Sequence, residues 1–110
     1  MKTRYLSFIV EDQRIKKDPK CDFTGLVTGT KGIYMAKFSF DKDWREYRKV
    51  AVFRTTKITK YVPIVNGMCA VPDEVSDAMM YYVSVIGTGS SVSVPTTEVA
   101  VRQTKGGANG

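Results

Sequence analysis

Short alternating apolar runs follow one another from Lys37 to Arg102, and each of them ends in residues that favour turns. The runs are KFSF, KVAVF, YVPIV, MCAV, YYVSVIG and EVAVR. A period of two is typical of strands with one buried face, and many such strands at short spacing predict a sandwich or a barrel. We therefore predict an all-β domain, a β-sandwich of about seven to eight strands with one short helix.

Local signals place the expected elements along the chain. Pro72 followed by two acids favours the start of a helical turn, which we predict over 72–80. Residues 11–20 are polar and contain an Asp-Pro pair, so they are predicted to form a loop. The single tryptophan, Trp44, lies in a charged connection and is expected to fold back over one end of the core. The predicted strands are 5–10, 33–40, 49–54, 58–65, 68–71, 81–86 and 98–102, and short strands at 21–27 and 91–94 are left open.

The strongest local signal is the pair Asn66-Gly67, because a type I′ turn needs positive φ at both central residues. A hairpin is therefore predicted around it. Pro63 cannot donate a hydrogen bond to a ladder, so its strand is expected to be an edge strand or to carry a bulge. Counted outward from the turn, the predicted pairs are Val65 with Met68, Ile64 with Cys69, and Val62 with Val71.

The length of 110 residues fits a single domain, predicted over 1–103, and the final stretch 104–110 is predicted to be a flexible tail. The sequence contains no run of about 18 apolar residues, so no membrane-spanning helix is predicted. The N-terminus lacks the long apolar core of a secretory signal, so we expect the protein to stay where it is made. Without export, Cys21 and Cys69 are expected to be free thiols.

The chain contains no histidine, which removes the commonest general base and metal ligand. Asp41, Asp43 and Glu46 form a carboxylate-rich stretch, but they lack the spacing and the glycine of an EF-hand loop. The glycines near residue 88 are followed by no lysine and no helix, so they indicate a turn rather than a phosphate-binding loop. We predict no cofactor, no metal site and no enzymatic activity.

The net charge of +6 favours an acidic partner, or it serves solubility alone. The basic residues are spread along the chain, and on an alternating strand the aromatic side chains face away from Lys37. We therefore expect an acidic protein surface rather than nucleic acid as the partner, with a nucleic-acid-binding barrel as the alternative. Strands with two apolar faces leave a homo-oligomer open as well, although burial between two sheets explains them equally.

The segments KFSFDKDWREYRKVAVF, CAVPDEV, YYVSVIG and TTEVAVR together resemble small structural proteins of tailed bacteriophages. These are the immunoglobulin-like or related β-sandwich modules of heads, head fibres and baseplates, and the resemblance covers about 33 to 102. It implies a non-enzymatic virion protein, located in the virion, that binds capsid or other virion proteins. Because the chain ends in a short glycine-rich stretch, a head decoration or head-fibre type is expected.

Candidate interface residues lie in three segments: the N-terminal stretch, the loop expected over 14–20, and the connection around the tryptophan. A polar basic surface of this kind could dock on an acidic lattice. For the tryptophan, a role as a plug of the core is the alternative. The alternative expected function is a phage-encoded nucleic-acid-binding or host-modulating small protein. The candidates are Lys2, Arg4, Tyr5, Arg14, Lys16, Lys17, Lys20, Trp44 and Tyr47.

Overall fold

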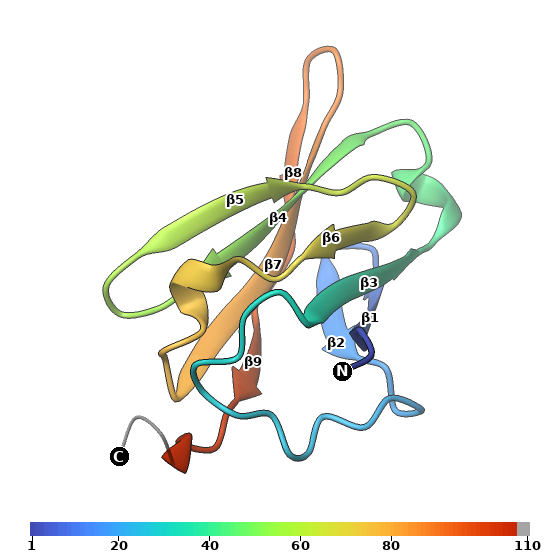
Figure 1. The fold of residues 1–110 in the computed structure, drawn as a ribbon. Coiled ribbons are helices and arrows are strands. Elements are labelled where there is room, and N and C mark those ends of the chain that lie inside the picture. Colours follow the sequence, from blue (N-terminus) through green and yellow to red (C-terminus); the bar gives the residue numbers. More distant parts are fainter. Residues whose placement is uncertain (108–110) are drawn as a thin grey trace.

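The computed structural model describes residues 1–107, which form nine strands in two sheets packed face to face (Figure 1). Two short 3-10 helices, η1 (Lys42–Trp44) and η2 (Asp73–Val75), connect strands, and no α-helix occurs in this part of the chain. The strands are β1 (Arg4–Glu11), β2 (Arg14–Lys17), β3 (Tyr34–Phe40), β4 (Arg48–Arg54), β5 (Thr59–Pro63), β6 (Met68–Ala70), β7 (Met80–Thr88), β8 (Ser93–Pro95) and β9 (Val99–Arg102).

The first sheet has the strand order β2-β1-β3-β6, and the second has the order β5-β4-β7-β8 with β9 also paired to β7. β1 and β3 run parallel, with Phe8 beside Phe38, and every other pairing between the nine strands is antiparallel. The parallel pairing requires a long crossover, which the chain makes through β2 and the loop that follows it.

The core lies between the two sheets and is built from the inward positions of each strand. Leu6, Phe8 and Val10 are buried from β1, and Val83 and Val85 are buried from β7. Because both sheets cover these rows within one chain, no second copy is needed to bury them. Trp44 is 1% exposed and completes the core, as the sequence predicted. Further fully buried side chains are Leu26, Phe53, Val75, Tyr81 and Val101.

The predicted β-sandwich is therefore confirmed, with about nine strands in place of seven to eight. The helix expected over 72–80 is shorter, because only η2 forms and β7 begins at Met80. The segment expected to be a loop over 11–20 contains β2. This polar segment forms a strand because its backbone pairs with β1, and its pattern of apolar and polar residues does not predict that pairing. The short strand left open at 21–27 is absent, and that stretch consists of turns with a single bridge from Val27 to Thr104.

The turn at Asn66-Gly67 is confirmed, with φ of 53° and 75° and a bridge between Val65 and Met68. The register predicted beyond that bridge is wrong: Ile64 does not pair with Cys69, and Val62 does not pair with Val71. β5 pairs with β4 in one sheet and β6 pairs with β3 in the other, so the turn links the two sheets. β5 is an edge strand, as Pro63 indicated.

Residues 104–107 are attached to the domain, contrary to the flexible tail predicted from 104 onward. The Thr104 N–H donates to the Leu26 carbonyl at 2.7 Å, and the Gly106 N–H donates to the Thr28 hydroxyl at 2.8 Å. The remainder of the predicted tail, 108–110, lies outside the described residues. Among residues 1–107, no helix has the length and the apolar character needed to cross a membrane.

Candidate docking surface

The outer face of the first sheet gathers several of the predicted interface residues. Tyr5, Ser7 and Ile9 alternate with the buried row of β1 and therefore point outward. Ile9 pairs with Lys16, and Glu11 pairs with Arg14, so two of the three basic side chains of β2 lie on this outward side. We call this surface the basic face; its members are Tyr5, Ser7, Ile9, Glu11, Arg14, Lys16, Met35, Lys37, Ser39, Met68 and Ala70.

Positive charge exceeds negative charge on the basic face. Lys16 lies 3.6 Å from Glu11, but both side chains are more than half exposed, so this ion pair is weak. Arg14 and Lys37 form no salt bridge with a carboxylate among the described residues. Tyr5 is 50% exposed on the same face, two residues before Ser7, the residue that pairs with Lys37. An exposed aromatic ring on the same sheet face as an excess of cations suits contact with an acidic protein surface.

Lys17 and Arg4 lie elsewhere and support the fold. Lys17 alternates to the other side of β2, where its amine lies 5.1 Å from the centre of the Phe23 ring. The Arg4 guanidinium donates to the carbonyl oxygens of Asp22 at 2.9 Å and Thr24 at 2.6 Å, which holds the following loop against β1. These two cations are therefore occupied by contacts within the chain.

Lys2 and Lys20 are exposed at two other places. Lys2 borders an open groove together with Tyr5, Val27 and Tyr34. Lys20 follows a turn in which its backbone N–H donates to the Asp18 carboxylate at 2.9 Å. The structure therefore places Tyr5, Arg14 and Lys16 on one side of the first sheet, with Lys2 near the Tyr5 end of β1 and Arg14 at the opposite end.

Trp44 and Tyr47 support the base of the β7–β8 hairpin rather than offering their rings to a partner. The indole Nε1 donates to the Asp12 carbonyl at 2.7 Å, and the two rings meet edge to face at 5.7 Å. Gly87 of β7 lies directly under the indole, since a Cβ there would stand 2.6 Å from the ring. The hairpin beyond this base projects from the body (Figure 1), and residues 88–95 carry no charge.

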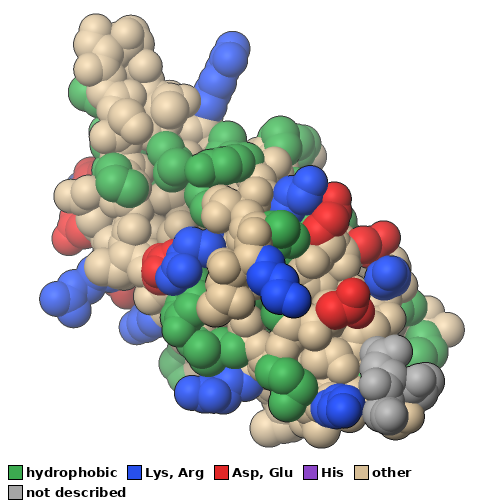
Figure 2. All heavy atoms as spheres, turned by 90° about the vertical axis from the view of Figure 1, so that its left-hand side faces the viewer, with side chains coloured by type: hydrophobic (Ala, Val, Ile, Leu, Met, Phe, Trp, Pro, Cys, Tyr) green, Lys and Arg blue, Asp and Glu red, His purple; other side chains and the backbone are tan. Residues whose placement is uncertain are grey.

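A second face of the molecule shows how charge is distributed away from the basic face. In Figure 2, basic and acidic side chains are mixed over the body, and the projecting part at the upper left is largely uncharged. Lys60 lies 3.0 Å from Glu74, so positive charge is partly neutralised between β5 and η2. This view therefore shows no single-sign patch comparable to the cations of β2 and β3.

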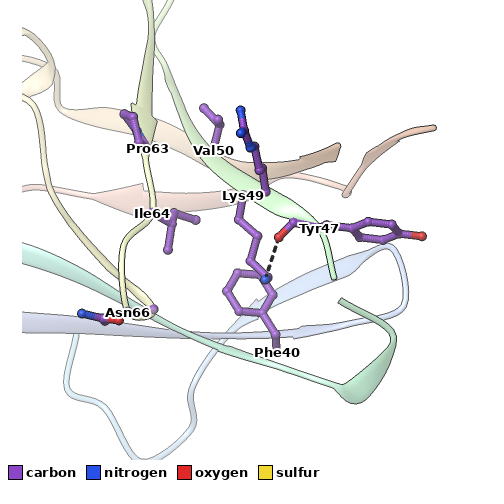
Figure 3. A pocket seen from close by; sticks show the side chains of 9 residues that line it. Phe40, Tyr47, Lys49, Val50, Pro63, Ile64 and Asn66 are labelled. Carbon is purple, nitrogen blue, oxygen red and sulfur yellow. Dashed lines mark hydrogen bonds between the residues drawn. The ribbon is translucent and has the colours of Figure 1, made fainter. Parts of the chain in front are cut away.

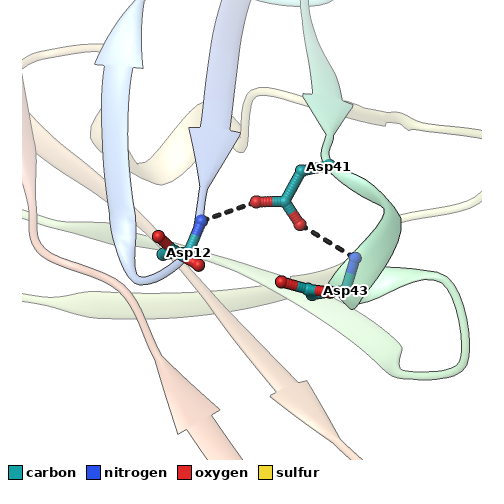
Figure 4. Close-up of side chains that lie close together, drawn as sticks. All are labelled: Asp12, Asp41 and Asp43. Carbon is teal, nitrogen blue, oxygen red and sulfur yellow. Dashed lines mark hydrogen bonds between the residues drawn. The ribbon is translucent and has the colours of Figure 1, made fainter.

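Three carboxylates meet where β1 and β3 end (Figure 4). Oxygen atoms of Asp12, Asp41 and Asp43 lie within 4.8 Å of one another. Asp41 accepts from the backbone N–H groups of Asp12 at 2.7 Å and Asp43 at 3.0 Å, so it caps η1 and ties it to the β1–β2 turn. Glu46, which the sequence grouped with Asp41 and Asp43, is not part of this cluster, and the capping bonds account for the position of Asp41.

The two cysteines differ in burial. Burial raises the pKa of the Cys69 thiol to about 12, so it stays protonated at neutral pH. Cys21 is half-buried and accepts a hydrogen bond at its Sγ from the Ser7 N–H at 3.3 Å. The described residues contain no disulfide between these two thiols.

Sequence reasoning placed Lys37 on the outward side of its strand but did not assign it to an interface. Lys37 lies beside β1 only because it pairs with Ser7 in the parallel ladder, and no local sequence pattern predicts that pairing. No protein-family model matches this chain, and no curated protein matches it. Function therefore has to be inferred from the fold and the surface, and the resemblance to phage virion proteins stays an expectation.

Proposed function

We propose that this chain is a non-enzymatic structural protein of a tailed-phage virion, of the head decoration or head-fibre type. In this proposal it binds capsid or other virion subunits through the basic face. The rigid sandwich presents that face, and recognition takes place without any chemical step.

The observation that supports the proposal is the composition of the basic face. It combines three cations, Arg14, Lys16 and Lys37, with one opposing carboxylate and with the exposed ring of Tyr5. Arginine, methionine and aromatic side chains are enriched at protein interfaces, and unpaired cations accelerate encounter with an acidic surface. The resemblance between about 33 and 102 adds the identity of the partner as a virion subunit.

Mass spectrometry of purified, nuclease-treated phage particles tests the proposal. We expect the chain at a stoichiometric ratio to the major capsid protein, and a ratio near one per subunit favours decoration over a fibre. A double charge reversal, Lys16→Glu with Lys37→Glu, should abolish incorporation. Lys57→Glu, on the β4–β5 turn, is the matched control and should be incorporated normally. Absence of the wild-type chain from particles would contradict the proposal.

The alternative is a nucleic-acid-binding or host-modulating protein, favoured by the same net charge of +6. Its signature would be a steep fall of affinity for DNA or RNA as salt concentration rises, because phosphate contacts release counterions. We expect no such binding at physiological salt. A steep salt dependence together with absence from particles would support the alternative.

A further inference from the structure

β4 carries a lysine where its alternation requires an apolar side chain. Lys49 shares the inward side of the strand with Ala51 and Phe53, which are both 0% exposed. It pairs with Gly87, whose backbone the Trp44 ring touches. A cation on a core-facing row loses part of its hydration, so Lys49 departs from the rule that inward strand positions carry apolar side chains. Departures of this kind concentrate at functional sites.

The amine of Lys49 has incomplete partners within the chain. It donates to the Tyr47 carbonyl at 3.0 Å and lies 5.2 Å from the centre of the Phe40 ring (Figure 3). It forms no salt bridge with any carboxylate of residues 1–107. An ammonium group has three N–H donors, so donors remain free for an acceptor from outside the chain.

The free donors border a groove of about 530 Å³ that combines an apolar surface with positive charge. Its volume falls within the roughly 300–1,000 Å³ of ordinary binding pockets. In Figure 3, Lys49 runs over Phe40, with Ile64 and Asn66 on the opposite side of the space. No aspartate or glutamate lines the groove, and Arg48 adds a second cation. We call it the Lys49 groove; it is lined by Phe40, Tyr47, Arg48, Lys49, Val50, Pro63, Ile64, Asn66 and Gly67.

We propose that the Lys49 groove binds an extended segment of a partner protein in which an acidic residue stands beside an apolar one. The carboxylate accepts from the Lys49 amine, and the apolar side chain covers Phe40 and Ile64. Charge complementarity selects this occupant, because the groove holds two cations and no acid. That the partner is a virion subunit rests on the proposed function; the chemistry of the segment does not.

The test uses the full chain and an acetylated Gly-Leu-Glu-Phe-Glu-Gly amide as the probe, with amide chemical shifts followed by NMR. We expect shifts confined to the residues around Lys49, Ile64 and Gly67. Lys49→Met keeps the stem and removes the charge, and it should raise the dissociation constant about tenfold. Lys57→Met removes the same charge at the opposite end of the β4–β5 hairpin, and it should change affinity less than about twofold.

The analogue with glutamine in place of both glutamates provides a measurement on the unchanged protein, so the test survives if Lys49→Met fails to fold. Equal binding of both peptides, scattered shifts, or equal losses for the two lysine variants would overturn the proposal. If a short oligothymidylate causes larger shifts than the peptide, and these shifts depend on Lys49, the partner of the groove is nucleic acid and not a protein.

The two proposals fail in distinguishable ways. A chain absent from particles that still binds the peptide in the groove contradicts the virion role and leaves the groove intact. A chain abundant in particles that ignores the peptide contradicts the groove alone.

Discussion

Replacing Gly87 by alanine tests how closely the Trp44 ring presses on the backbone of β7. A Cβ at this position would stand 2.6 Å from Cζ3 of the indole and 3.0 Å from Cδ2 of Tyr47. Ordinary contact begins at 3.4 Å, so the indole would have to move by about 0.8 Å. It has little freedom to do so, because it is 1% exposed and its Nε1 donates to the Asp12 carbonyl at 2.7 Å.

Two effects add to the expected destabilisation. Inserting a methyl group into a packed core costs about 1–3 kcal/mol. A displacement of this size also lengthens the indole hydrogen bond past the range of roughly 2.7–3.2 Å, which removes about 1 kcal/mol more. We therefore expect Gly87→Ala to lower the free energy of unfolding by about 2–4 kcal/mol.

Urea denaturation followed by far-ultraviolet circular dichroism measures this change. Gly107→Ala is the control, because a Cβ there meets nothing within 4 Å, and its effect should stay below about 0.5 kcal/mol. In a Trp44→Leu background the ring is gone, so the same alanine should cost less than half as much. An unchanged stability of Gly87→Ala, or an equal cost in both backgrounds, would refute the close-contact reasoning.

The remaining predictions concern three other groups. Since burial raises the pKa of Cys69 to about 12, a thiol reagent at neutral pH should label the folded chain once, at Cys21, and the chain in urea twice, as mass spectrometry can count. Tyr81→Phe should leave the urea midpoint unchanged or raise stability by about 1 kcal/mol, because the buried hydroxyl has no hydrogen-bond partner among residues 1–107. Arg54 holds the pKa of Glu98 below its ordinary 4.5, so this pair stabilises the folded chain fully above about pH 4.5 and less as the pH falls further. Glu98→Gln should therefore flatten the curve of unfolding free energy against pH below about pH 4.5. An unaltered curve would contradict this prediction.

The strand faces were predictable because alternation records burial directly. The rows containing Phe8, Phe38, Phe53 and Val83 are inward in the structure, as a period of two requires. β2 escaped prediction because Ile15 is its single apolar residue, and pairing with β1 rather than propensity makes it a strand. Local pattern describes a strand well only when the strand contributes several side chains to the core.

The assignment of strands to sheets was not predictable from local chemistry. A two-residue turn normally joins neighbours in one sheet, yet the chain leaves Asn66-Gly67 toward β6 in the other sheet. The Phe38 N–H donates to the Gly67 carbonyl at 2.7 Å, and the Ile64 N–H donates to the Lys49 carbonyl at 2.9 Å. The two sides of the turn are therefore hydrogen-bonded to different sheets. These partners lie far apart in the sequence, and turn propensity carries no information about them.

The docking surface was predictable in part. Tyr5, Arg14 and Lys16 were among the expected interface residues, and the β1–β2 pairing places them on one side of a sheet. Lys37 joins them only through the parallel pairing of β1 with β3, which is a non-local event. Lys49 stood in the sequence as an ordinary strand-bounding lysine, and its inward position became informative only once Ala51 and Phe53 were known to be buried.

The two ends of the described chain converge on the same loop. Val27 bridges Thr104 and also borders the groove that Met1 and Tyr5 line, so the first strand and the last described residues share a neighbour. The loop around Val27 therefore fastens the beginning of the sandwich to its end, and it holds in place two segments that about a hundred residues of chain separate.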